Sequence, residues 1–169
     1  MASTSSISDP TITRAAVGRR TLLFRVGATV YGCDIEDIRE IVPFRRATRL
    51  PGAPSYIQGL INLRGTIVTV IDLVGRLEPG RPPVTDGSIM LVGIGGSARM
   101  VGIAVQEVMD VRLMGGDGKE DADDGAPRSH GGGDGGGSSD GIVRGLGRVD
   151  DTVVILLDIH QLLKQVLLS

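Results

Sequence analysis

Residues 59–65 (GLINLRG) contain the side chains best suited to recognising another molecule. A strand that ends in a turn explains the apolar positions and Gly65, because glycine adopts backbone angles that other residues resist. Such a turn gives no structural reason for Asn62 or Arg64. An arginine on a rigid turn presents a planar guanidinium that forms charge-assisted hydrogen bonds with carboxylates. The stretch therefore predicts a recognition site.

The remaining reactive side chains fit no catalytic or metal-binding pattern. Residues 93–98 (GIGGSA) match a loosened dinucleotide-binding motif, but a strand-like segment follows where the phosphate-binding helix should begin, so a hairpin loop is expected. Cys33 lies in an apolar strand and is interpreted as a small core residue. Neither His130 nor His160 is spaced to act with a serine and an acid, or to bind a metal. We expect no enzymatic activity and no cofactor.

Residues 115–141 are rich in glycine and acidic residues. They contain 11 of the 26 glycines and seven acidic residues, with only Lys119 and Arg128 as basic residues. The acids do not fit a calcium-binding EF-hand loop, because the glycine after Asp124 comes one position too early. Ordering so much glycine is costly in entropy when little apolar surface is buried. A flexible loop is predicted here, and a disordered tail over residues 1–19.

The overall composition describes a domain with a sizeable core and an ordinary charge. The chain has 169 residues, 41% of them hydrophobic, and a net charge of −2, so no basic excess points to nucleic acid. Cys33 is the single cysteine, which excludes a disulfide framework. No apolar run reaches the roughly 18 residues of a membrane span, and the N-terminus has no secretory signal pattern. A cytoplasmic protein is expected.

Short apolar runs between turn residues predict a mostly β fold. Helices are few: Asp34 is a candidate cap for a short helix over 35–41, and Asp158 for an amphipathic helix at the C-terminus. The expected strands are three hairpins and one buried strand, at 21–26 with 29–35, 59–63 with 66–71, 88–94 with 100–105, and 153–157.

The chain contains a divergent internal repeat. A shift of 70 residues aligns 30–35 with 100–105, and a shift of 86 aligns 66–72 with 152–158. Each copy would be a β unit of about 60 residues, which buries too little surface to be stable alone. Two pseudo-symmetric five-stranded β-barrels are therefore expected, with the C-terminal helix bracing them. The copies differ in charge at one turn, where Arg64-Gly65 corresponds to Asp150-Asp151.

The sequence resembles the CheW-like domain of bacterial chemotaxis coupling proteins. The resemblance covers nearly everything after the N-terminal tail, and a domain over 20–168 is expected. It implies two intertwined SH3-like barrels, roughly 30–85 and 20–29 plus 86–168. One departure is Gln106, at a position where the family often has an aspartate. The resemblance is carried by residues 24–35, 36–41, 51–54 (PGAP), 59–65, 70–73 and 156–159.

The resemblance also implies two binding surfaces for protein partners. An acid and an arginine of this chain, Glu40 and Arg64, would pair on a receptor-facing rim beside Ile38. The complete expected receptor-binding set is Ile38, Glu40, Asn62, Arg64 and Gly65. The expected kinase-binding set is Val42, Phe44, Arg49, Leu50 and Pro51.

The function implied is that of a non-enzymatic adaptor. It would couple chemoreceptors (methyl-accepting chemotaxis proteins) to the regulatory domain of the CheA histidine kinase, in the cytoplasm and at membrane receptor arrays, without inserting into the membrane. Two alternatives stay open. One is a scaffold of the same family in another kinase pathway, such as surface motility or second-messenger signalling. The other is a small ligand-binding barrel that uses residues 93–98 or the acidic loop.

Overall fold

The computed structural model describes residues 18–114 and 141–168. Strand β1 begins at Arg19, inside the expected tail; residues 1–17 of that tail and the acidic segment 115–140 lie outside the described residues. The described elements are β1 (Arg19–Val26), β2 (Thr29–Asp34), η1 (Ile35–Asp37), β3 (Ile38–Pro43), β4 (Ile57–Leu63), β5 (Thr66–Asp72), α2 (Leu73–Leu77), β6 (Ser88–Gly93), β7 (Met100–Val105), β8 (Glu107–Met114), β9 (Val143–Val149), β10 (Thr152–Leu157) and α3 (Ile159–Leu168).

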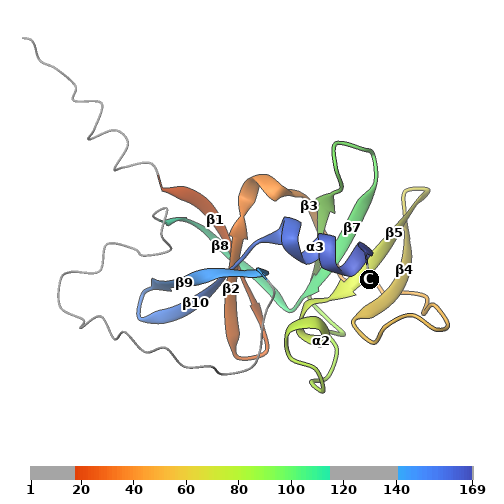
Figure 1. Cartoon of the computed structure of the whole chain (residues 1–169), viewed down its shortest axis with the longest axis horizontal. Helices are drawn as coiled ribbons and strands as arrows, with labels where there is room; N and C mark the ends of the chain where they lie inside the picture. The colour runs from red at the N-terminus through yellow and green to blue at the C-terminus, as the bar shows by residue number, and fades with distance from the viewer. Residues whose placement is uncertain (1–17, 115–140, 169) are drawn as a thin grey trace, which may run out of the picture.

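The strands form two five-stranded sheets that lie side by side along the long axis of the molecule (Figure 1). Sheet A has the order β8-β1-β2-β10-β9, and sheet B has the order β3-β6-β7-β5-β4. Each sheet is antiparallel except for one central parallel pair, β2 with β10 in sheet A and β7 with β5 in sheet B. The prediction of a mostly β fold with two related five-stranded units is confirmed.

The internal repeat is visible in the register of the two sheets. In sheet A, Leu156 lies opposite Gly32 of the parallel neighbour and Gly145 of the antiparallel one. In sheet B, Val70 lies opposite Gly102 and Gly59. These partners are the same ones that the shifts of 70 and 86 residues align. The two sheets therefore share their strand order, their strand directions and their register.

The strands are divided between the sheets differently from the expected boundaries of 30–85 and 20–29 plus 86–168. Sheet A takes β1 and β2 together with β8–β10, whereas sheet B takes β3–β7. Each copy of the repeat thus gives its first hairpin to one sheet and its other three strands to the other. A repeat in the sequence identifies equivalent strands, but it does not say which copy of a hairpin completes which sheet.

The expected closed barrels are not found: within the described ranges, no ladder joins the edge strands of either sheet. In sheet B the chain beyond β3 reaches β4 through one isolated bridge, in which Thr48 and Leu60 exchange backbone hydrogen bonds of 2.8 Å. Gly59 makes this approach possible, since a Cβ at that position would collide with the carbonyl of Thr48.

The helices agree with the sequence at the C-terminus and differ elsewhere. Asp158 caps α3 by accepting from the backbone N–H of Gln161 at 3.1 Å, as expected. The helix expected over 35–41 is only the three residues of η1, because the β-branched segment that follows pairs with β6 as strand β3. Helix α2 was not predicted from the sequence, although its cap Asp72 aligns with Asp158 in the repeat.

The described residues form two hydrophobic clusters, a smaller one within sheet A and a larger core that extends through both sheets. Members of the larger core come from strands of both sheets and from α2 and α3. Helix α3 follows sheet A and runs toward sheet B (Figure 1), with its apolar face in this core. Polar contacts help to hold it: the Arg76 guanidinium of α2 donates to Gln165 Oε1 at 2.6 Å, and His160 Nε2 lies 2.8 Å from Asp37 Oδ1 of η1. The core and the helix together connect the two sheets.

Candidate protein-binding site

The turn between β4 and β5 holds Arg64 in a fixed position. Arg64 and Gly65 have φ angles of 49° and 85°, and two consecutive positive φ values are typical of the tight turn in a two-residue hairpin. The side-chain oxygen of Asn62 accepts a hydrogen bond from the backbone N–H of Gly65 at 2.9 Å. Asn62 therefore stabilises the turn, which is a role that the sequence did not reveal.

Arg64 forms the expected ion pair with Glu40 of strand β3. The guanidinium Nη2 lies 2.5 Å from the Glu40 carboxylate, and both side chains remain largely exposed, 66% for Arg64 and 41% for Glu40. Strand β3 is one edge of sheet B, and the turn follows β4 at the other edge. The ion pair thus presents its charges to solvent while it joins two edges of one sheet.

Apolar side chains lie on the same strands as this polar pair. Ile41 and Ile67 are exposed on β3 and β5, whereas Ile38 is half-buried and packs against the core. Exposed charged and aliphatic groups on one sheet offer polar and apolar contact to a protein partner. Residues 38, 40, 62, 64 and 65, all predicted for one site, come from β3 and the β4–β5 hairpin of the same sheet.

A second surface of sheet B is a groove of about 560 Å³. Two of the residues predicted for kinase binding, Phe44 and Arg49, lie in its lining. Val42 is buried in the core, and Leu50 and Pro51 are exposed outside the lining, so the five do not form one surface. The full lining is Phe44, Arg46, Ala47, Arg49, Ser55, Ile57, Gln58, Pro83, Val84 and Thr85.

Only part of this groove can be recognised from the sequence. Its basic side chains come from one short run, 45–49, which contains three arginines and no acid. The wall formed by 83–85 follows α2 and lies far from that run in the sequence. Its position depends on how sheet B folds.

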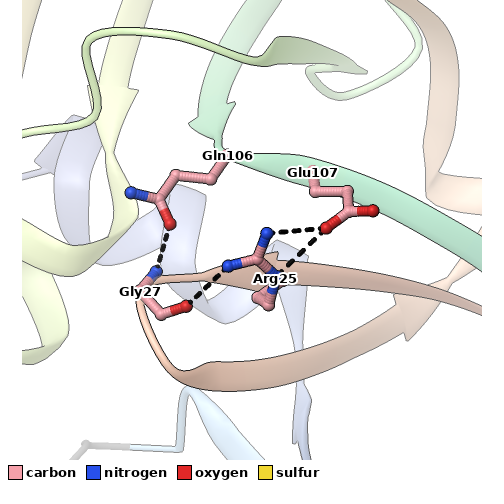
Figure 2. A network of polar contacts seen from close by, with 4 residues as sticks. All are labelled: Arg25, Gly27, Gln106 and Glu107. Carbon is pink, nitrogen blue, oxygen red and sulfur yellow. Dashed lines mark hydrogen bonds and ion pairs between the residues drawn. The ribbon is translucent and has the colours of Figure 1, made fainter.

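Gln106 lies at the crossover from sheet B to sheet A and anchors it (Figure 2). Its side-chain oxygen accepts from the backbone N–H of Gly27 at 2.6 Å, and its own backbone N–H donates to the carbonyl of Arg25 at 3.1 Å. Arg25 in turn donates to Glu107 at 2.7 and 3.1 Å. Gln106 thus fixes the β1–β2 turn against the crossover.

The described residues offer little for catalysis or metal binding. Within 18–114 and 141–168, no three His, Cys, Asp or Glu side chains gather as a metal site. Burial, and then the charges of Asp37 and Asp34, raise the pKa of Cys33 to about 12, which keeps it an unreactive thiol. Residues 94–99 connect β6 and β7 as a hairpin loop, as predicted. His130 and the acidic segment considered for calcium lie outside the described residues.

Comparison with known protein families shows which family has this sequence and fold. A family model described as CheW-like domain matches residues 20–167. The chain belongs to the CheW family. Members of this family are scaffold adaptors and not enzymes. The family match confirms the resemblance inferred from the sequence.

Individual CheW proteins support this membership. The chain is 32% identical over 148 residues to the chemotaxis protein CheW of Klebsiella aerogenes, covering 87% of this chain and 82% of that protein. It is 34% identical over 94 residues to CheW of Bacillus subtilis, covering 56% of this chain and 60% of that protein. The crystal structure of the scaffolding protein TtCheW from Thermoanaerobacter tengcongensis superposes with a TM-score of 0.67 at 29% identity, covering 86% of this chain and 87% of that one.

The helices of this CheW-family chain are short. In the part of the chain that the structure describes, none is long and apolar enough to cross a membrane.

Proposed function

We propose that the chain couples chemoreceptor cytoplasmic tips to a CheA-type histidine kinase. The adaptor class follows from membership of the CheW family, while the partners and the surfaces they use are part of the proposal. The exposed ion pair between Glu40 and Arg64 carries it, because a guanidinium held on a rigid turn can orient a partner through charge-assisted hydrogen bonds. We further propose that this coupling takes place in the cytoplasm, at membrane receptor arrays.

The receptor would bind sheet B at the end formed by β3 and the β4–β5 hairpin. Its binding set is Ile38, Glu40, Asn62, Arg64 and Gly65. Glu40 and Arg64 would make direct polar contacts, whereas Asn62 and Gly65 act through the shape of the turn. The exposed side chains of Ile41 and Ile67 would supply apolar contact to a helical partner.

The kinase would bind at the groove that contains Phe44 and Arg49. The half-buried aromatic ring of Phe44 and the exposed guanidinium of Arg49 lie in a hollow large enough to take side chains of a partner. Leu50 and Pro51 would extend this surface onto the following loop, which is exposed. Val42 is left out because its side chain is buried.

The fold proposal is that each sheet curls into an SH3-like barrel within one CheW-like domain over 20–168. Side chains join opposite edges of each sheet: Glu40 reaches Arg64 in sheet B, and in sheet A Arg112 of β8 contacts Asp150 of the β9–β10 turn at 3.4 Å. These contacts support a curled sheet even where no backbone ladder closes it.

Binding to purified partner fragments tests the functional proposal. Titration of a chemoreceptor signalling fragment and of a kinase regulatory domain is expected to show binding of both to the wild type. Arg64→Glu should weaken receptor binding by about 1–3 kcal/mol, as for loss of a charged hydrogen-bond partner, and leave kinase binding unchanged. Arg49→Glu should weaken kinase binding and leave receptor binding unchanged.

The control is Arg148→Glu, which makes the same charge change at an exposed site on β9 of sheet A. It should leave both affinities unchanged. Receptor binding that Arg64→Glu does not alter would remove this turn from the site. Affinity capture from the native cytoplasm distinguishes a role in chemotaxis from a role in another kinase pathway, because it identifies the kinase and the receptors that bind the chain.

A further inference from the structure

The receptor-binding end proposed for sheet B has a counterpart in sheet A with the same backbone. The turn Arg64-Gly65 has φ angles of 49° and 85°, and the turn Asp150-Asp151 has φ angles of 47° and 65°. Glu40 on β3 and Asp110 on β8 each lie next to the point where the pairing register of their edge strand shifts. The two hairpins that carry the turns lie at opposite ends of the molecule (Figure 1). The two ends thus share one backbone arrangement.

The apolar surroundings of the two surfaces also agree. Ile41 of sheet B is 40% exposed, and its counterpart Val111 of sheet A is 37% exposed. Ile67 is 60% exposed, and its counterpart Val153 is 57% exposed. A partner that recognised only backbone shape and aliphatic surface would therefore bind to both ends. Discrimination between the two ends must come from the polar residues.

The polar residues differ in sign and in pairing. Where sheet B has Glu40 and Arg64, sheet A has two carboxylates, Asp110 and Asp150. Arg112 lies between them, with Nε 3.0 Å from Asp110 and Nη2 3.4 Å from Asp150. The counterpart of Arg112 in sheet B is Val42, which is buried. In sheet A the arginine thus bridges β8 and the turn, and Asp150 and Asp151 face solvent on the turn.

We propose that Arg112, Asp150 and Asp151 restrict the receptor to sheet B, so that each chain binds one receptor tip. This inference rests on the proposed function. An acceptor group that complements Arg64 would meet the like charge of Asp150 on sheet A, and like charges across an interface are unfavourable. Arg112 does not replace Arg64, because its guanidinium already contacts two carboxylates of its own sheet, whereas Arg64 contacts one.

Transplanting the sheet B residues onto sheet A tests this. The variant combines Asp150→Arg, Asp151→Gly and Arg112→Val. Removal of Arg112 frees Asp110 to pair with the arginine introduced at the turn. All three altered side chains are exposed, so circular dichroism and the melting temperature should stay near the wild-type values. The readout is the number of chemoreceptor fragments bound per chain, measured by titration calorimetry and by sedimentation.

The wild type should bind one fragment per chain and the transplant two. In an Arg64→Glu background, which lacks the original site, the transplant should restore binding of one fragment. The matched control in that background is Arg112→Val alone, which should restore none. A folded transplant that still binds one fragment, or that fails to rescue Arg64→Glu, would overturn the inference and leave the proposed function intact. A wild type that binds no fragment would overturn both.

Discussion

Glu40 and Arg64 are 24 residues apart in the chain, yet their side chains form a direct ion pair across the ends of sheet B. The contact requires strand β3 at one edge and the β4–β5 turn at the other to curve toward each other. Its two side chains are largely exposed, so water and salt screen their attraction. The pair therefore matters more for what it presents to a partner than for the stability of the fold.

A charge swap separates these two roles of the pair. Glu40→Arg or Arg64→Glu alone should lower the free energy of unfolding by only about 0.2–1 kcal/mol, as for exposed ion pairs. The double swap should restore that stability and still bind the receptor fragment poorly, because the charges now occupy exchanged positions. Urea denaturation and fragment binding measure the two effects. Normal receptor binding by the double swap would contradict the proposed role of Arg64.

The β4–β5 turn should be sensitive to a side chain at Gly65. Gly65→Ala places a Cβ on a residue with φ of 85°, and left-handed backbone costs an L-residue about 1–2 kcal/mol. Thermal or urea denaturation should show a loss of that order. Gly145→Ala on strand β9 is the control, since nothing lies within 4 Å of a Cβ there and its φ is not in the left-handed region. Equal losses in both variants would refute the backbone argument.

The Gln106 contact should stabilise the crossover between the sheets. Gln106→Ala removes the acceptor for the N–H of Gly27, and loss of one hydrogen bond typically costs about 0.5–1.5 kcal/mol. Gln106→Glu keeps an acceptor oxygen and should cost less. Amide hydrogen exchange at Gly27, compared between the two variants, tests the specific contact. Unchanged protection in Gln106→Ala would show that this hydrogen bond does not hold the turn.

Cys33 should make the fold less stable in alkali. Its pKa is about 12 when folded and about 8.5 in an unfolded chain, so the unfolded state releases the proton first as pH rises. The contribution of the thiol is complete below about pH 8.5 and is lost as pH rises toward 12, by about 1.4 kcal/mol per pH unit. The stability advantage of the wild type over Cys33→Ala should therefore shrink above pH 8.5.

Unfolding free energies at several pH values between 8 and 10.5 measure this. Tyr31, whose pKa burial also raises, is present in both proteins and cancels in the comparison. Val26→Ala removes a buried side chain without an ionisable group, so its deficit should stay constant over the same range. A deficit for Cys33→Ala that is equally constant would contradict the buried-thiol argument.

Elements with local signals could be predicted from the sequence. The three hairpins were recognised because turn residues separate short apolar runs, and α3 because Asp158 caps an apolar face of helical period. The helix predicted over 35–41 was wrong beyond Asp37, since the apolar spacing of this segment suits a helix as well as a strand. Its pairing with β6, which lies about fifty residues later, decided for the strand. Helix α2 has the length of little more than one turn, which is too short for periodicity to detect.

The candidate site also has parts that the sequence predicts and parts that only the fold brings together. Asn62, Arg64 and Gly65 stand out because they are adjacent in one hairpin. Their partner Glu40 was expected only through the resemblance to a family. The groove at Phe44 and Arg49 needs the segment 83–85 as a wall, and no local pattern brings these segments together.

The sequence by itself determined seven of the ten described strands, with β3, β8 and β9 missed. It also determined that the chain contains two related sets of elements, and that one turn carries an arginine where the other carries two aspartates. These properties reside in nearest neighbours along the chain and in a comparison of the chain with itself. Only the tertiary structure decided that the copies exchange their first hairpins, that Arg112 bridges Asp110 and Asp150, and that Val42 is buried. Those outcomes depend on contacts between distant segments, whose energies are shared over the whole core.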